Sequence, residues 1–439
     1  MTKKQKKIFL ALAVTMLALA ARSALIQIAY ETNRPPDDNG KMDSVVIWVG
    51  PDPDTSVLYI SDKTQNGVEM HDANTNQYIG RLGDTVSPEI DFSYPNGLAI
   101  AYDVALNGGT TDVLFVVERD TQRVTMVSVP DHKLLGRFGG VELEEPYGIA
   151  LSKEEGVLTA WITETKSSID NVIIYKITPE GNGLKGELDF QFATEGGLES
   201  IVIDEQHEKV YLSDEREPSS VMVYDKKGKF IKRIAQGLFV GEAEGVVIYK
   251  TDLMNGYLIV TDQNAEPTEF EVFDRASLNH IGHFSGTTKG TDGIALTQKA
   301  TTRFPFGSFY AVHSDEAAHA YDWKDIATAL GLQIKVDGDV ASGVRKKQEN
   351  APSGFVLFPA YPNPGKPEKL VSFRIPRKAR VEIGVYNIQG RKVADIADTT
   401  YDAGMHVVKF RTVGLATGTY VISMRSGGTH LSRSVVLIK

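Results

Sequence analysis

Six residues with oxygen-bearing side chains recur between residues 43 and 292 and could together bind a cation. Each precedes a small residue and then an alternating apolar stretch; they are Asp43, Asn96, Tyr147, Glu199, Glu244 and Asp292. If these positions meet in the fold, four carboxylates would repel one another unless a cation lay among them. Carboxylate, amide and phenol oxygens favour a hard ion such as Ca²⁺ over zinc. A ring held by hydrogen bonds and water, without a tightly bound metal, is the alternative.

Basic residues follow the second apolar stretch of the first four repeats. They are Lys63, Arg119, Lys166 and Arg216. Basic side chains beside a bound cation would form an anion-binding mouth, and arginine suits bidentate contact with phosphate. The pattern therefore predicts a polyanionic ligand, with phosphate as the most obvious group.

The repeat itself indicates how these residues are positioned. Successive leading residues lie 53, 51, 52, 45 and 48 positions apart, and each unit contains about four strand-like stretches. Four strands in a unit of this length are typical of a β-propeller blade. We therefore predict an all-β protein with a six-bladed β-propeller over residues 40–332, in which the leading residues form a ring around the central channel.

The remaining C-terminal part predicts a linker over 333–354 and a small β-sandwich domain over 355–439. Its motifs are Tyr361-Pro362-Asn363-Pro364, the turn at Asn387–Arg391 and Leu415–Tyr420. In order and spacing they resemble the C-terminal sorting domain of type IX secretion. The resemblance implies export across an outer membrane, with the secretion machinery as a partner. A carbohydrate-binding or adhesive sandwich is the alternative.

Residues 1–24 have the pattern of a secretory signal peptide. Four lysines precede an apolar run from Ile8 to Ala21, and small residues at Ala18 and Ala20, or at Ala21 and Ser23, offer cleavage positions. The run is short for a membrane span, although an uncleaved anchor is the alternative. We expect a secreted protein, outside the cell or at the outer cell surface.

Composition excludes several classes of function. The 439 residues carry a net charge of −10, which argues against nucleic acid as a partner because phosphate-backbone binding requires a surplus of lysine and arginine. Cysteine is absent, so disulfides, thiol nucleophiles and thiolate metal sites are excluded. The sequence also lacks a glycine-rich nucleotide loop, a serine-centred elbow and a histidine-based zinc motif. A monomer is expected.

Residues 40–332 resemble the β-propeller phytases, which are secreted calcium-dependent phosphatases of inositol hexakisphosphate (phytate). The resemblance lies in Tyr147-Gly148, Glu244-Gly245, Thr291–Ile294, Phe304–Phe309 and Trp323–Ile326. It implies several Ca²⁺ ions as cofactors. The implied metal ligands are Asp43, Glu199, Asp214, Glu244, Gln263 and Asp292. The resemblance also implies that four residues contact the substrate phosphate and act in catalysis. They are Lys63, Arg119, Tyr147 and Lys166.

The chain departs from the family pattern at three points. Gly40–Met42 replace an acidic, proline-containing run, Ser167 stands where a carboxylate is common, and Asp214 stands in place of a glutamate. The resemblance implies hydrolysis by a metal-activated water, with the basic side chains neutralising the phosphate. A calcium-dependent propeller lactonase or esterase is one alternative. A non-catalytic, calcium-dependent polyanion-binding surface protein is the other.

Overall fold

A computed structural model describes residues 22–33, 39–165, 170–263, 266–336, 355–357, 368–375, 377–401, 404–412 and 414–437. Most of the predicted signal segment and linker, Lys166, Ser167 and the Tyr361–Pro364 motif lie outside these residues. The chain divides into two compact units. The first comprises residues 1–297 and 308–334, and the second comprises residues 298–307 and 335–439.

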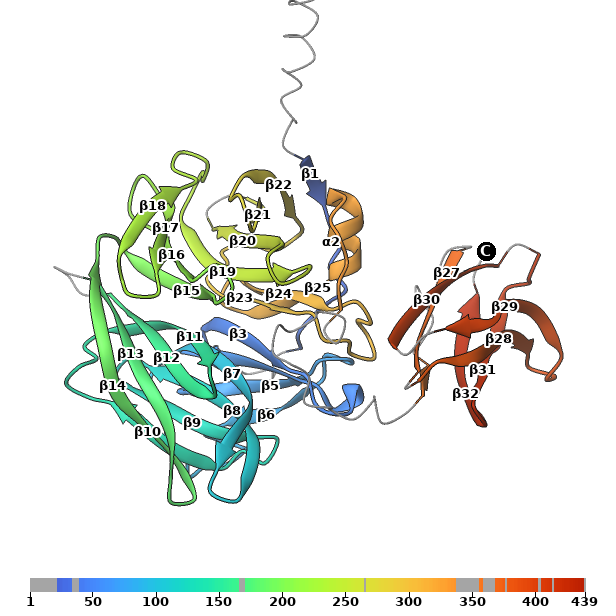
Figure 1. Cartoon of the computed structure of the whole chain (residues 1–439), viewed down its shortest axis with the longest axis horizontal. Coiled ribbons are helices and arrows are strands. Elements are labelled where there is room, and N and C mark those ends of the chain that lie inside the picture. Colours follow the sequence, from blue (N-terminus) through green and yellow to red (C-terminus); the bar gives the residue numbers. More distant parts are fainter. Residues whose placement is uncertain are drawn as a thin grey trace, which may run out of the picture. The chain divides into compact units, whose positions relative to one another are not determined.

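The first unit is a six-bladed β-propeller (Figure 1), which confirms the predicted fold. Blades 1–3 each contain four strands in sequence order. These are β3 (Met42–Trp48), β4 (Val57–Asp62), β5 (Gly67–Asp72) and β6 (Tyr78–Leu82); β7 (Pro95–Leu106), β8 (Gly109–Glu118), β9 (Arg123–Val129) and β10 (Leu134–Gly139); and β11 (Pro146–Glu154), β12 (Val157–Glu164), β13 (Asp170–Glu180) and β14 (Gly183–Thr194). A 3₁₀ turn, Pro53–Thr55, links β3 to β4.

Blades 4–6 continue the same order. They contain β15 (Leu198–Asp204), β16 (Lys209–Asp214), β17 (Ser220–Asp225) and β18 (Phe230–Ile234); β19 (Ala243–Lys250), β20 (Gly256–Asp262), β21 (Glu269–Asp274) and β22 (His280–Ser285); and β23 (Ile294–Thr297), β24 (Ser308–His313) and β25 (Ala317–Asp322). Helix α2 (Trp323–Leu330) follows, capped by the Asp322 side chain, which accepts a hydrogen bond from the Lys324 N–H. The innermost strands β3, β7, β11, β15, β19 and β23 contact one another in turn around the ring.

Two short N-terminal strands complete the last blades. Strand β2 (Tyr30–Glu31) is the fourth strand of blade 6, and β1 (Arg22–Leu25) adds a parallel fifth strand to blade 5. The Tyr30 hydroxyl also donates a hydrogen bond of 3.0 Å to the Ala73 carbonyl in blade 1. The propeller unit thus contains strands that precede residue 40, and residues 22–24 of the predicted signal segment lie in β1.

A β-bulge occurs near the start of each innermost strand in blades 1–5. Two residues of the strand, the leading residue and the small one after it, oppose a single residue of the second strand. A bulge redirects the side chain that it contains. In blade 3 the Thr163 hydroxyl accepts the Gly148 N–H at 2.7 Å, and in blade 4 the Ser213 hydroxyl accepts the Ser200 N–H at 2.8 Å. The repeat therefore encodes a β-bulge that sets the direction of the leading side chain in these blades.

The small residue in each bulge, directly after the leading residue, allows close packing between blades. A Cβ at Gly97 would lie 2.4 Å from the Tyr147 carbonyl, one at Gly148 2.5 Å from that of Glu199, and one at Gly293 2.5 Å from that of Asp43. The last contact joins blade 6 to blade 1 and closes the ring. Backbone oxygen atoms cannot move away cheaply, so these positions require glycine.

Replacing Gly148 by alanine is expected to lower the free energy of unfolding by about 1–3 kcal/mol, because the added methyl group must displace backbone in a packed ring. Urea unfolding of the two proteins measures the difference. Gly109→Ala is the matched control, since a Cβ at Gly109 would have no atom within 4 Å. Equal losses in both variants would contradict the packing role of Gly148.

The second unit contains two β-sheets that enclose a separate hydrophobic core, as predicted for a β-sandwich. One sheet has the order β26 (Val356–Leu357), β27 (Glu368–Ile375) and β30 (Gly404–Arg411). The other has the order β29 (Lys392–Tyr401), β28 (Ala379–Asn387), β31 (Gly418–Ser426) and β32 (Thr429–Leu437). Val371, Phe373, Ile383, Ile422 and Val435 are among its buried core residues. Across the described parts of both units, no helix is sufficiently long and apolar to span a membrane.

Candidate functional site

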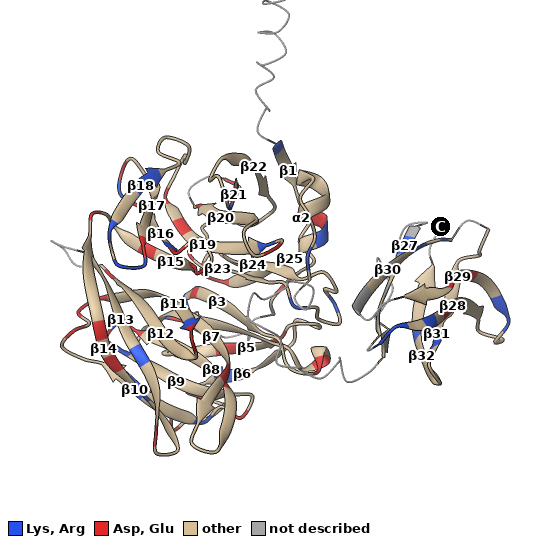
Figure 2. Ribbon diagram, viewed as in Figure 1, with Lys and Arg blue, Asp and Glu red and all other residues tan. Residues whose placement is uncertain are grey.

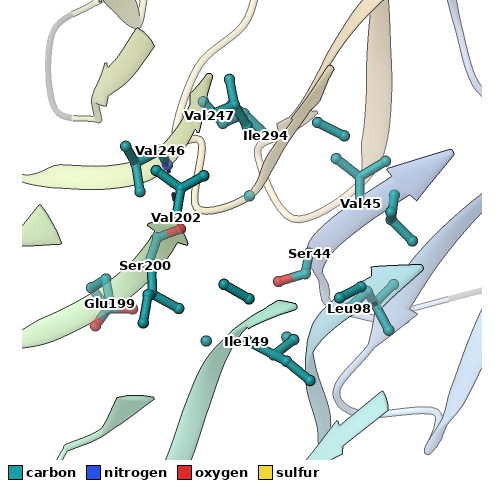
Figure 3. Close-up of a pocket in the computed structure, with 18 of the residues that line it drawn as sticks. Ser44, Val45, Leu98, Ile149, Glu199, Ser200, Val202, Val246, Val247 and Ile294 are labelled. Carbon is teal, nitrogen blue, oxygen red and sulfur yellow. Dashed lines mark hydrogen bonds between the residues drawn. The ribbon is translucent and has the colours of Figure 1, made fainter. Parts of the chain in front are cut away.

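The leading residues of five blades lie at one central cavity of about 310 Å³. Asp43, Tyr147, Glu199, Glu244 and Asp292 line it together with the apolar residues of the innermost strands. Figure 3 shows Val45, Leu98, Ile149, Val246 and Ile294 projecting from different blades around this space. Figure 2 marks acidic positions in red on β3, β15 and β19. The structure thus brings a cluster of carboxylates, the acidic ring, to the propeller axis. We use this name for Asp43, Glu199, Glu244 and Asp292.

Lys63 lies against the acidic ring. Its Nζ atom is 2.6 Å from Asp43 Oδ2 and 3.6 Å from Asp292 Oδ2, and its side chain is only 13% exposed. Burial alone would lower the pKa of Lys63, but the carboxylates of Asp43, Asp292 and Asp315 raise it above its ordinary value. Lys63 is therefore a fixed positive charge at the mouth of the cavity.

Tyr147 and Arg119 form a second part of the mouth. The Tyr147 hydroxyl donates a hydrogen bond to Asp43 Oδ2 at 3.5 Å. The Arg119 guanidinium lies 5.8 Å from the centre of the Tyr147 ring and pairs with Glu145 at 3.2 Å. Burial and then the four carboxylates of the acidic ring raise the pKa of Tyr147 far above its ordinary value, so the phenol keeps its proton.

The carboxylates of the acidic ring destabilise one another when charged. Burial, followed by repulsion from Glu244 and Glu215, raises the pKa of Glu199 well above its ordinary value. Burial and then repulsion from Asp292 do the same to the pKa of Glu244. For Asp292, burial and Asp43 together raise the pKa to about 7 although Lys63 opposes them. Such a group of oxygen ligands is favourable only with added positive charge.

Asp214 does not lie in this cluster. It ends the second strand of its blade, and its side chain pairs with Arg233 and accepts the N–H of Gly197 at 2.9 Å. The other second strands of blades 1–5 end in the same way. Asp62 accepts the Lys41 N–H, Glu118 that of Ser93, Glu164 that of Glu145, and Asp262 that of Gly241. These carboxylates fix the loop that leads into each innermost strand.

The residue directly after each second strand faces the acidic ring in several blades. In blade 4 this residue is Glu215, which hydrogen-bonds to Glu199 and whose charge raises the pKa of both Glu199 and Glu244. The same position holds Lys63 in blade 1, Arg119 in blade 2 and Gln263 in blade 5. Its backbone N–H donates to the loop before the first strand in every blade, which confirms the equivalence. Sequence reasoning missed Glu215, although the repeat register contained the signal.

Two further acidic residues influence the site and were also missed. The charge of Glu242 raises the pKa of Glu215 and of Glu244, after burial in each case. Asp315 acts on Lys63 and Asp292. Both residues lie in loops rather than in strands, so the alternation of the repeat does not single them out.

The remaining predicted residues are placed as follows. The Gln263 amide nitrogen donates to Asp292 Oδ1, so Gln263 lies beside the acidic ring. Arg216 instead pairs with Asp170 and the Gly196 carbonyl. Lys166 lies outside the described residues. Gly40 belongs to the segment that replaces the acidic run of the family. It packs directly on the Asp62 carboxylate, since a Cβ at Gly40 would be 1.7 Å from Asp62 Oδ2.

The donor set fits a hard cation. Asp43, Glu199, Glu215, Glu244 and Asp292 supply carboxylate oxygens and Gln263 an amide, while none of these is a nitrogen or sulfur donor of the kind that zinc prefers. Asn96, the sixth leading residue, is fully buried, and neither of its amide atoms has a hydrogen-bond partner among the described residues. Such an orphaned polar group costs about 1–3 kcal/mol unless water or a ligand satisfies it.

Comparison with known proteins agrees with the two-part organisation. The phytase family profile matches residues 6–348, and the profile of the secretion system C-terminal sorting domain matches residues 359–439. No curated protein matches.

Two solved structures that match are only distantly similar to this chain. Kuenenia stuttgartiensis hydrazine synthase has a TM-score of 0.43 and 12% identity over 66% of this chain and 99% of that one. A complex of BBS1N with ARL6DN, soaked with lead, has a TM-score of 0.43 and 11% identity over 68% of this chain and 97% of that one. The family profile, by contrast, spans most of the sequence, including every residue of the acidic ring. The chain belongs to the phytase family and ends in a secretion system C-terminal sorting domain.

Proposed function

We propose that this protein is a secreted, calcium-dependent phosphatase that releases phosphate from myo-inositol hexakisphosphate and related inositol phosphates. The observation that carries the proposal is the acidic ring with Lys63 and Arg119 at its mouth. Carboxylates alone would repel a phosphate ester. Carboxylates that hold cations, bordered by two cationic side chains, would attract it.

Asp43, Glu199, Glu215, Glu244, Gln263 and Asp292 would hold the calcium ions. Bound calcium would lower the pKa of a coordinated water and neutralise negative charge on the phosphate. Glu215 takes the place that the family resemblance gave to Asp214, because Glu215 contacts Glu199 while Asp214 pairs with Arg233.

The basic side chains would bind and orient the substrate. Bound calcium would balance the charges of Asp43 and Asp292. Lys63 Nζ would then donate a hydrogen bond to an oxygen of the reacting phosphate. Arg119, which is 37% exposed, is accessible for bidentate contact with a phosphate group. Tyr147, with its proton retained, would donate from its hydroxyl. These donors stabilise the negative charge that develops on phosphate oxygens during transfer. Lys166 is proposed for the same role on the resemblance alone.

The decisive experiment measures inorganic phosphate released from phytate by the full chain, with Ca²⁺ and then with excess chelator. We expect release only with Ca²⁺. Aryl esters and lactones serve as parallel substrates, and calorimetry measures phytate binding. Hydrolysis of esters or lactones without phosphate release would indicate the calcium-dependent lactonase or esterase. Phytate binding without any release would indicate a non-catalytic polyanion-binding protein.

Glu215→Gln and Asp214→Asn should have different effects although the residues are adjacent. Glu215→Gln is expected to weaken calcium affinity by at least about 10-fold, because it removes a charged ligand from the ring. Asp214→Asn is expected to lower the free energy of unfolding by about 1–3 kcal/mol, because it removes the charged partner of the partly exposed Arg233. Calcium titration and urea unfolding of both variants measure these effects. Weaker calcium binding in Asp214→Asn alone would reverse the assignment.

We also propose export through a cleaved signal peptide, followed by type IX secretion through the C-terminal domain. Arg22–Leu25 pair with β22, and the Arg22 guanidinium donates to the Leu330 carbonyl at the end of α2. Cleavage after Ala20 would keep this strand, whereas cleavage after Ser23 would remove half of it. The mass of the exported protein is therefore expected to correspond to an N-terminus at Ala21. An N-terminus at Ala24 would contradict this prediction.

A further inference from the structure

A group of histidines and glutamates lies in blade 5, away from the acidic ring. Glu269 and Glu271 are on the same face of β21, and His283 on β22 is directly opposite Glu271. One carboxylate oxygen from each glutamate and one ring nitrogen of His283 lie within 4.8 Å of one another. His283 Nδ1 is 3.7 Å from Glu271 Oε1. The other ring nitrogen, Nε2, is 3.6 Å from Glu269 Oε1, so only the first of these distances joins two ligands of an ion bound at Nδ1. Ligand atoms of a tetrahedral zinc site, each about 2.0–2.2 Å from the metal, are themselves about 3.3–3.6 Å apart.

The surroundings of these three residues resemble the outer shell of a metal site. His280 Nε2 contacts the second oxygen of Glu271, whose side chain is only 3% exposed, and this contact orients the carboxylate. The Ser23 hydroxyl lies 2.9 Å from His283 Nε2. A histidine that binds a metal through one nitrogen commonly donates a hydrogen bond from the other, which fixes its ring. Ser23 would accept that bond and leave Nδ1 for the ion.

The local charge also favours a divalent cation. Asp262 is fully buried beside this group, so three carboxylates meet two histidines. In a second group, Glu31, His313 and His319, one possible ligand atom of each residue also lies within 4.8 Å of the others. However, both His319 nitrogens are already hydrogen-bonded, to Thr288 and Glu31, and the Glu31 side chain is 54% exposed.

We propose that Glu269, Glu271 and His283 form a binding site for Zn²⁺ or a similar transition-metal ion. The site is separate from the calcium ligands of the acidic ring. Its imidazole nitrogen distinguishes it chemically from the acidic ring, because nitrogen donors select zinc-like ions over calcium. The ion would join β21 to β22 and, through Ser23, hold strand β1 at the edge of the blade.

The test is a Zn²⁺ titration of the full chain in excess Ca²⁺, which occupies oxygen-only sites. The wild type is expected to bind one equivalent of Zn²⁺ that His283→Ala binds at least about 100-fold more weakly. Ser23→Ala is expected to weaken binding by about 10-fold. His207→Ala is the matched control, because His207 pairs with Asp204 in blade 4 and should not affect zinc. His319→Ala should retain the same equivalent.

Co²⁺ provides a spectroscopic readout in the same proteins, since imidazole coordination changes its visible absorption. If His283→Ala does not fold, Glu269→Gln replaces it, because the Glu269 side chain is at the rim and is 31% exposed. The absence of a zinc equivalent in the wild type would overturn the proposal. Equal affinity in the wild type and in the folded ligand variants would overturn it as well. Phosphate release is expected to be unchanged in His283→Ala, so this result is independent of the proposed phosphatase activity.

Discussion

Glu199→Gln is expected to lower phosphate release from phytate by about 10²–10³-fold, the range found when one electrostatic contact of a transition state is removed. Glutamine keeps the shape of the side chain and one oxygen but removes the charge that would hold the cation. Initial rates at saturating Ca²⁺ measure the loss. Glu154→Gln is the matched control, because Glu154 pairs with Lys226 elsewhere in the propeller and its side chain is 55% exposed.

The same substitution should stabilise the protein when calcium is absent. Burial and repulsion raise the pKa of Glu199, so a neutral side chain removes an unfavourable charge. Urea unfolding in chelator is therefore expected to show a more stable variant, and added Ca²⁺ should stabilise it less than the wild type. A variant that is inactive and also unfolded in chelator would contradict the role of Glu199 in the acidic ring.

Removal of calcium is expected to make the stability of the propeller strongly dependent on pH. The pKa of Asp292 is raised from 3.8 in the unfolded chain to about 7 in the folded one. Between these values the folded state binds more protons than the unfolded state. The free energy of unfolding of the metal-free protein should therefore fall as the pH rises from about 4 to 7, by a few kcal/mol in order of magnitude. Glu199 and Glu244 act in the same direction.

Saturating Ca²⁺ should oppose this trend, because an ion that binds only the folded state stabilises it by about 2.7 kcal/mol at 100 times its dissociation constant. Thermal unfolding across this pH range, with Ca²⁺ and with chelator, provides the measurement. The gap between the two curves is expected to widen with pH. A gap that is constant or narrows with pH would contradict the proposed cluster of mutually repelling carboxylates.

The fold was predictable because each repeat contains the residues that form the first strand of a blade and its contact with the next blade. A leading polar residue, a small residue and an apolar stretch recur six times, and the bulges show why each is needed. The leading residue is turned toward the axis, and the small residue after it, glycine in four blades and serine in two, permits contact with the next blade. The short strands β1 and β2 were not predicted, because two to four residues at a blade edge carry no distinct hydrophobic alternation.

The site was only partly predictable, and the choice between Asp214 and Glu215 shows why. Both are acidic and adjacent, so residue type cannot separate them. The position in the repeat does separate them, since Asp214 corresponds to Asp62 and Glu118, which hold backbone, while Glu215 corresponds to Lys63 and Arg119. Glu242 and Asp315 act from loops, where the repeat fixes neither side-chain direction nor distance.

The attachment of β1 and β2 to the last two blades has a consequence for biogenesis. The first residues that the structure describes pair with strands that ribosomes make about 260 to 290 residues later, at Gly282 and Ala320. These two pairings therefore cannot form until the strands of blades 5 and 6 have been synthesised. If the chain crosses a membrane unfolded by means of the proposed signal peptide, these pairings would close the propeller only after both of its ends had crossed.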